Sequence, residues 1–267
     1  MNWIGERVEY FLRMASPERA APIAEPMASV GPPPLLYAVG DIHGMRGKLD
    51  RLLELIEADA EIVAREAVVV FLGDLINRGP ASRQVLERLI AGPGRAGDRW
   101  ITLRGNHDQL FIDAIGGKSE AAFEQLMRKG GLETLASYGV RKKDASLARA
   151  RRAVPREHLR FLESLPLSYV VGDYFFVHAG VDPERPLGQQ SEKALMTIRE
   201  PFLRNAHRLP VTVVHGHVAN LKGPVVATRR ICVDTGAYAT GVLTAVALTP
   251  FSPGERAPVR FLATLPG

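Results

Sequence analysis

The sequence has almost no cysteine and no long apolar run. Cys232 is the only cysteine in 267 residues, so no internal disulfide can form, and its apolar neighbours indicate a small buried side chain. The longest apolar stretches, such as 67–72, are strand-sized and far shorter than the roughly 20 residues of a membrane-spanning helix. Glu6 and Glu9 interrupt the N-terminal hydrophobic residues, which is unlike a secretory signal. We therefore expect no transmembrane segment and a cytoplasmic location.

Aromatic residues are also scarce, at 7%, and the formal net charge of +5 is basic. The basic residues gather at 141–143 and 149–160, in helix-like segments without interleaved aromatics. Such charge is typical of solvated helix faces, whereas single-strand binding surfaces combine charge with stacking side chains. We expect no stable nucleic-acid partner.

Prolines separate the N-terminal region from the remainder of the chain. Residues 1–34 read as a tail with a short amphipathic helix at 3–14 and a proline-rich linker, in which the prolines break any regular element. The chain as a whole has ordinary globular composition, with 46% apolar content, and residues 35–267 are expected to form one domain.

Strand-like and helix-like patterns alternate from residue 35 onward. Strands are expected at 35–39, 67–72 and 100–103, and helices at 48–60 and 82–90. This alternation predicts right-handed βαβ units around a largely parallel sheet, whose ligands collect at the carboxyl ends of the strands.

The second half of the chain has a different order of helix-like and strand-like segments. A helical flank is expected at about 108–166, followed by strands at 167–171, 174–177, 211–214, 231–233, 242–248 and 259–263. These short, turn-linked strands predict a second sheet packed on the first.

Five polar motifs each follow an apolar run. They are Gly-Asp-Ile-His-Gly at 40–44, Gly-Asp-Leu-Ile-Asn-Arg-Gly at 73–79, Gly-Asn-His-Asp at 105–108, His-Ala-Gly at 178–180 and His-Gly-His at 215–217. Any one of them could be a helix cap or a structural histidine. Together they supply carboxylate, imidazole and amide ligands for two metal ions, which indicates a hydrolase of phosphate esters.

The second motif carries the most chemistry. Asp74 ends the most apolar strand, where a carboxylate is costly unless it is paired, capping or bound to metal. Arg78 would bring a fork of donors to a phosphoryl group. In the third motif, Asn106 and His107 diverge in a turn, so one can bind metal while the other faces substrate.

These motifs resemble, in order and spacing over about residues 37–248, the calcineurin-like metallophosphoesterases. The resemblance is to their phosphoprotein phosphatase branch, which includes bacterial serine/threonine phosphatases and symmetrical diadenosine tetraphosphatases. It implies an α/β (α+β) fold of two mixed β-sheets packed as a sandwich and flanked by helices. It further implies a first metal held by Asp41, His43 and Asp74, and a second held by Asp74, Asn106, His178 and His217.

The same resemblance implies the remaining roles. Arg78 and Arg199 would clamp phosphate, with Asn106 also facing substrate, and His107 would be the general acid. Two divalent ions, expected to be manganese with iron or zinc as alternatives, would activate a water for in-line attack without a covalent phosphoenzyme.

Two positions depart from the protein phosphatase pattern. Asn77 stands where those relatives carry an aspartate that supports the catalytic histidine, so His107 is expected to be a poorer acid. Thr197 replaces a tryptophan. Diadenosine tetraphosphatases often lack this aspartate, whereas the segment 234–238 is more like that of the bacterial protein phosphatases.

Three functions follow in order of preference. The first is a serine/threonine protein phosphatase-like phosphomonoesterase acting on phosphorylated protein, and the second is a symmetrical diadenosine tetraphosphate hydrolase acting on a nucleotide. The third is a metal-binding protein that recognises phosphorylated ligands with weakened catalysis.

Overall fold

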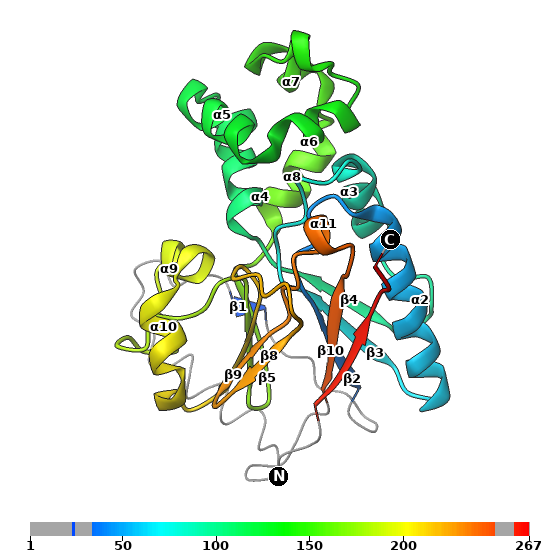
Figure 1. Ribbon diagram of the computed structural model, residues 1–267, viewed down its shortest axis with the longest axis vertical. Helices are drawn as coiled ribbons and strands as arrows, with labels where there is room; N and C mark the ends of the chain where they lie inside the picture. The colour runs from blue at the N-terminus through cyan, green and yellow to red at the C-terminus, as the bar shows by residue number, and fades with distance from the viewer. Residues whose placement is uncertain (1–22, 25–33, 249–258, 267) are drawn as a thin grey trace.

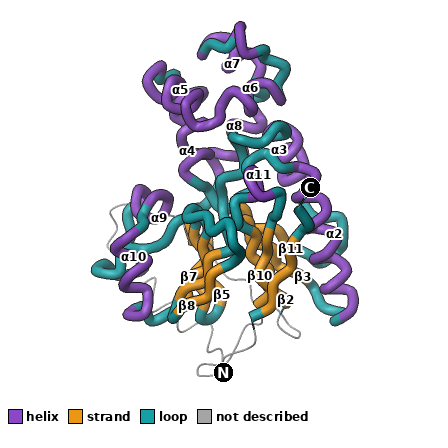
Figure 2. Tube along the Cα trace, in the orientation of Figure 1, coloured by secondary structure: helices purple, strands orange, loops and turns teal. Residues whose placement is uncertain are grey.

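The computed structural model describes residues 23–24, 34–248 and 259–266, and the helix expected at 3–14 lies outside these ranges. Two β-sheets lie side by side, each covered by helices on its outer face, and a group of helices extends beyond one end of the pair (Figures 1 and 2). The fold expected from the resemblance, two mixed sheets flanked by helices, is therefore confirmed.

The first sheet has the order β11-β10-β2-β3-β4. Its members are β2 (Leu35–Val39), β3 (Ala67–Phe71), β4 (Arg99–Thr102), β10 (Thr244–Leu248) and β11 (Arg260–Ala263). β2, β3 and β4 pair in parallel, with Leu36 opposite Val68, and β10 adds to β2 antiparallel. The expected βαβ units form the centre of this sheet.

The second sheet has the order β1-β5-β6-β7-β9-β8. It comprises β1 (Ile23–Ala24), β5 (Ser168–Val171), β6 (Tyr174–Val177), β7 (Thr212–His215), β8 (Val225–Ala227) and β9 (Arg230–Cys232). β6, β7 and β9 pair in parallel, and so do β1 and β5, while β5 pairs antiparallel to β6 and β8 antiparallel to β9.

The assignment of every late strand to the second sheet was wrong. β10 and β11 return to the first sheet, where β10 occupies the free edge of β2. Strand patterns in the sequence show which face is buried but not which partner a strand chooses. Strands β1 and β8 were not predicted, and β1 lies within the linker where prolines were expected to exclude regular structure.

Alternating side chains divide the interior into three layers. Leu36 and Ala38 pack between the sheets, whereas Tyr37 and Val39 on the same strand face the helices of the first sheet. In β6, Phe176 faces the first sheet and its neighbours face the opposite layer. This period of two places both faces of each central strand in apolar surroundings.

Helices cover the outer faces. α2 (Arg46–Ile62) and α3 (Ser82–Ala91) lie on the first sheet, and α9 (Glu192–Thr197) and α10 (Glu200–Asn205) lie on the second (Figure 1). Shorter turns are η4 (Leu187–Gln189), η5 (Ala206–Arg208) and α11 (Ala237–Thr240). Within the described ranges, no helix has the length and apolarity needed to cross a membrane.

The helical extension follows β4. It contains α4 (Asn106–Phe111), η1 (Ile112–Gly116), α5 (Glu120–Leu126), η2 (Met127–Gly131), α6 (Leu132–Ser137), η3 (Lys142–Asp144), α7 (Leu147–Ala153) and α8 (Arg156–Ser164). α7 is the tip farthest from the sheets, and α4 is the part beside the strand ends (Figure 1).

Candidate metal centre

The predicted ligands lie where the two sheets present the carboxyl ends of their parallel strands. Asp41 and His43 follow β2, Asp74 follows β3, and Asn106 follows β4 and opens α4. His178 and His217 follow β6 and β7 of the second sheet. The centre therefore forms at the seam between sheets, which is where parallel strands of both direct their chain ends.

Asp74 is the shared member of two ligand groups. Its Oδ2 lies 3.6 Å from His43 Nε2, and its Oδ1 lies 3.5 Å from His178 Nε2. Asp74, His178 and His217 place ligand atoms within 4.8 Å of one another, and so do His43, Asp74 and His107. One carboxylate thus has an imidazole on each side, as a bridging ligand requires.

Asp41 and Asn106 complete the arrangement. Asp41 Oδ2 is 3.9 Å from His43 Nε2, while its Oδ1 accepts a hydrogen bond of 3.1 Å from the His217 backbone N–H. Asn106 Oδ1 is 3.1 Å from His178 Nε2. All six residues predicted as metal ligands are brought together.

Backbone carbonyls orient the imidazoles. His43 Nδ1 lies 2.9 Å from the Ile76 carbonyl and His178 Nδ1 lies 2.9 Å from the Leu72 carbonyl, so each Nδ1–H donates and each Nε2 lone pair faces the centre. Burial lowers the pKa of His43 to about 3 and that of His178 to about 4. Both rings are therefore kept in the neutral form that binds metal.

The carboxyl groups show the opposite shift. Burial, reinforced by Asp234 and Asp74, raises the pKa of Asp41 well above its usual range, and burial raises that of Asp74 to about 7. Buried carboxylates that repel one another need a compensating cation. Oxygen and imidazole donors around this acidic cluster fit divalent metal ions of the manganese, iron or zinc type.

Glycines make the close approach of these groups feasible. A side chain at residue 216 would place its Cβ 2.1 Å from Asp41 Oδ1, and one at residue 105 would meet Asp74 Oδ1 at 2.3 Å. The backbone is also strained here, because five of the eight described non-glycine residues with positive φ are His43, Asp74, Asn77, Arg78 and His217. Strain that gathers in this way is typical of functional sites.

A buried hydrogen-bond network fixes the orientation of His107. The Thr134 hydroxyl donates to Asn77 Oδ1 at 2.8 Å, which turns Asn77 Nδ2 toward His107 Nδ1 at 3.0 Å. Ser82 Oγ lies 2.9 Å from Thr134 Oγ1 and supports the same network. Since Asn77 Nδ2 is a donor, His107 Nδ1 must accept and Nε2 carries the proton.

Arg78 lies over the same corner of the centre. Its Nη2 is 3.4 Å from His107 Nε2, so both side chains present a nitrogen atom at this corner. The guanidinium packs 4.3 Å from the ring centroid of Tyr238, whose ring also meets His43 edge-on at 5.3 Å. Arg199 is exposed at the start of α10. Burial lowers the pKa of His217 to about 3, and the charge of Arg199 contributes to this shift.

The sequence matches a family model described as calcineurin-like phosphoesterase over residues 35–244. The chain belongs to this family. The match includes every predicted metal ligand and the strands that present them.

This calcineurin-like phosphoesterase has curated relatives with nucleotide substrates in their names. It is 35% identical over 148 residues to the symmetrical bis(5'-nucleosyl)-tetraphosphatase of Methylococcus capsulatus, covering 55% of this chain and 44% of that protein. The protein of the same name from Dechloromonas aromatica is 33% identical over 172 residues, or 63% of this chain and 52% of the relative. The chain spans about half the length of the curated relatives it matches.

Solved structures share its fold. A putative diadenosine tetraphosphatase gives a TM-score of 0.64 at 23% identity, covering 93% of this chain and all of that one. A protein serine/threonine phosphatase from Saccharomyces cerevisiae gives 0.55 at 14% identity, with coverages of 98% and 88%.

Two buried acids of this phosphoesterase were not predicted as site residues. Asp234, which follows β9, accepts a hydrogen bond of 2.9 Å from the Gly236 N–H, and after the larger effect of burial its charge raises the pKa of Asp41. Asp108 accepts from Leu75 N–H at 3.0 Å and Gly105 N–H at 2.9 Å, so it joins two ligand loops. Asp108 lies in the third motif and Asp234 in the segment 234–238, and their position at the start of a helix or after a strand was the available signal.

The other histidine of the fifth motif lies away from the centre. His215 Nδ1 lies 2.9 Å from the Gly216 carbonyl, and its ring packs edge-on against Phe202 at 5.0 Å. Of the two histidines in this motif, it is therefore His217, the one predicted as a metal ligand, that lies at the centre.

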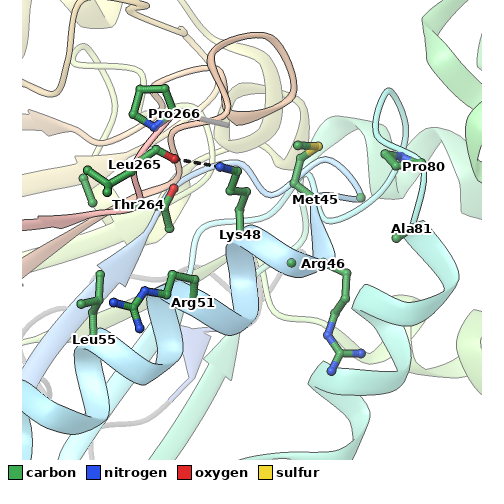
Figure 3. A pocket seen from close by; sticks show the side chains of 13 residues that line it. Met45, Arg46, Lys48, Arg51, Leu55, Pro80, Ala81, Thr264, Leu265 and Pro266 are labelled. Carbon is green, nitrogen blue, oxygen red and sulfur yellow. Dashed lines mark hydrogen bonds between the residues drawn. The ribbon is translucent and has the colours of Figure 1, made fainter.

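A cavity of about 660 Å³ lies beside the centre, between the start of α2 and the segment after β11 (Figure 3). Lys48 Nζ crosses it to donate to the Leu265 carbonyl at 2.8 Å. Gly44 and Pro80, from the two loops that carry His43 and Arg78, line the cavity, but the candidate ligands do not. It is lined by none of the groups assigned to chemistry.

Proposed function

We propose that this chain is a two-metal phosphoesterase that hydrolyses phosphoanhydride bonds in dinucleoside polyphosphates. Its preferred cleavage would be the symmetrical one that converts diadenosine tetraphosphate into two molecules of ADP. This raises the second sequence hypothesis above the protein phosphatase hypothesis, because the curated relatives carry that activity in their names.

The proposed ligand sets divide around Asp74. Asp41, His43 and Asp74 would hold the first ion, and the second would be held by Asp74, Asn106, His178 and His217. When bound, two divalent ions supply a water of lowered pKa and neutralise charge on the phosphoryl group. Manganese is the proposed ion, with iron or zinc as alternatives.

The observation that carries the proposal is the contact between Asn77 and His107. The neutral amide lies 3.0 Å from His107 Nδ1, in the place where a carboxylate would stabilise the imidazolium. Burial, with His43 and Arg78 nearby, lowers the pKa of His107 to about 2. His107 can then donate a hydrogen bond from Nε2 but is a weak proton donor, which favours leaving groups that are themselves weak bases.

A nucleoside diphosphate is such a leaving group, whereas a serine alkoxide is not. In this proposal His107 Nε2–H and the Arg78 guanidinium, whose nitrogen atoms lie 3.4 Å apart, contact oxygens of the phosphoryl group and of the leaving group. Arg199 would neutralise a further oxygen from the side of His217, and Asn106 would border the substrate.

A serine/threonine phosphatase-like activity is the second candidate. It is favoured by the segment 234–238, in which Asp234 contacts Asp41 and Tyr238 packs on Arg78. A third candidate, a phospho-ligand binding protein with weakened catalysis, is disfavoured by the presence of the full ligand set.

The test uses purified, manganese-loaded protein with diadenosine tetraphosphate and with a phosphoserine peptide. Chromatography should show ADP as the only nucleotide product, with kcat/KM at least about tenfold above that for the peptide. Formation of AMP and ATP, or no release at all, counts against symmetrical cleavage, and faster hydrolysis of the peptide would favour the second candidate. Undetectable turnover with every metal, together with salt-sensitive polyanion binding, would favour the third.

A further inference from the structure

We propose that Lys129 is a substrate-binding residue that contacts the phosphoryl groups beyond the scissile one and so selects polyphosphates over phosphate monoesters. This rests on the proposed function, because it assigns part of that substrate to a residue of the helical extension. Lys129 belongs to none of the five motifs.

The turn that carries Lys129 packs directly on Arg78. In η2, the Gly130 carbonyl accepts a hydrogen bond of 3.0 Å from the Arg78 backbone N–H. Gly130 has a φ of +88°, and a Cβ there would lie 2.7 Å from the Arg78 nitrogen. Lys129 departs from helical geometry at the same place, with φ −104° and ψ 24°. The backbone therefore holds Lys129 beside the proposed phosphate clamp.

The next helix makes a second contact between the helical extension and the loop that carries Arg78. Thr134, in α6, accepts from the Asn77 backbone N–H at 3.0 Å and donates to its side chain at 2.8 Å. The extension thus contacts both Asn77 and Arg78, through Thr134 and Gly130. Two attachments fix the position of the intervening turn relative to the metal centre.

The Lys129 side chain is exposed and has no hydrogen bond or ion pair with any residue in the described ranges. Its neighbour Arg128 instead lies 3.8 Å from Glu124, with which it forms an exposed ion pair. An unpaired ammonium group therefore lies on the turn that packs against Arg78.

Three cations from separate elements border the centre: Arg78 after β3, Lys129 in η2 and Arg199 at α10. A monoester has one phosphoryl group, which the metal ions and the arginines can neutralise. A tetraphosphate chain carries further charged groups on either side of the bond to be cleaved. A flexible point charge such as lysine suits a neighbouring phosphate, whose position varies more than that of the reacting one.

The test compares Lys129→Gln and Lys129→Arg with Arg128→Gln, which removes a charge from the adjacent residue that is already paired with Glu124. We expect Lys129→Gln to lower kcat/KM for diadenosine tetraphosphate about tenfold, mostly through KM, and that for p-nitrophenyl phosphate at most threefold. Lys129→Arg should keep at least half of the wild-type value, and Arg128→Gln should behave as wild type.

A second readout does not depend on nucleotide hydrolysis. With manganese in excess, inorganic tripolyphosphate and orthophosphate are measured as competitive inhibitors of p-nitrophenyl phosphate hydrolysis. Lys129→Gln should raise the inhibition constant of tripolyphosphate about tenfold, equivalent to about 1.4 kcal/mol, and that of orthophosphate less than threefold.

Equal changes for both inhibitors, or no change for either, would overturn the role of Lys129. If the wild type releases no ADP yet the tripolyphosphate effect is present, the proposed function fails while the polyphosphate-binding role stands. If the wild type releases ADP but Lys129→Gln has no selective effect on tripolyphosphate, the proposed function stands and the role of Lys129 fails.

The turn itself can be tested with a pair of glycines. Gly130→Ala and Gly139→Ala both place a side chain at positive φ, but only residue 130 has an atom of Arg78 in the way. Gly130→Ala should weaken tripolyphosphate inhibition at least fivefold more than Gly139→Ala. Equal effects would show that the turn does not position the cations.

Discussion

Replacing Asn77 with aspartate should increase turnover for substrates with strongly basic leaving groups. The amide nitrogen lies 3.0 Å from His107 Nδ1, so a carboxylate in its place would face the imidazole ring at hydrogen-bond distance. Thr134 would still donate to the remaining oxygen, which keeps the geometry. Two unit charges about 4 Å apart attract by about 4 kcal/mol at an effective dielectric constant of about 20.

Part of this attraction is lost to desolvation, because Asn77 is fully buried. We expect about 1.4 to 2.7 kcal/mol to remain, which corresponds to a rise of about one to two units in the pKa of His107. Hydrolysis of alkyl phosphates, which depends on proton donation, should then accelerate about 10- to 100-fold. Hydrolysis of p-nitrophenyl phosphate and diadenosine tetraphosphate should change less than about threefold.

The assay is kcat/KM for wild type and Asn77→Asp over a series of aryl and alkyl phosphates, with each candidate metal. The dependence on leaving-group basicity should be shallower for the variant. Asn205→Asp, which adds the same charge at the end of α10, is the control. An equal effect on good and poor leaving groups, or none on either, would refute the role assigned to Asn77.

Two further substitutions test the contacts that hold the site and the fold. Thr134→Val removes the hydroxyl that orients Asn77, so it should lower kcat several-fold and the free energy of unfolding by about 1 to 3 kcal/mol. Thr197→Val, at an exposed position, is the control and should change neither quantity. Equal effects of the two substitutions would contradict the role of the Thr134–Asn77 hydrogen bond. Asp59→Asn should destabilise the protein by about 2 kcal/mol at pH 7 in urea unfolding, because Asp59 accepts two hydrogen bonds from Arg260, of 2.7 and 2.9 Å, and one from Tyr37. The Arg260 contact lowers the pKa of Asp59, so this stabilisation is present above the unfolded-state pKa and is lost as the pH falls through the folded-state pKa. The difference between wild type and Asp59→Asn should therefore shrink on acidification, and a difference that grows instead would contradict the assignment.

The convergence of the ligands could be predicted because each one directly follows an apolar run. Asp41, Asp74 and His178 stand at strand ends, and parallel strands bring such ends to one edge. The alternation of apolar residues also placed most strands within one or two residues of their observed limits. The local sequence pattern was therefore sufficient to predict those parts of the site that lie at strand ends.

Features that depend on distant partners could not be predicted in this way. The pairing of β10 with β2 joins residues about 200 positions apart, and no local signal selects that edge. Thr134 and Lys129 reach the centre only because the helical extension folds back on the turn at residues 77–78. Their sequence context, a helix following Gly130, is unremarkable without that contact.

The most direct test of the two-metal account is the metal content and activity of Asp74→Asn beside the wild type. Asp74 is the only carboxylate common to both ligand groups found in the described part of the chain. We predict two manganese ions per wild-type chain by elemental analysis and ADP release from diadenosine tetraphosphate. The variant should bind at most one ion and lose activity at least about a thousandfold, whereas two ions and full activity in the variant would contradict the account.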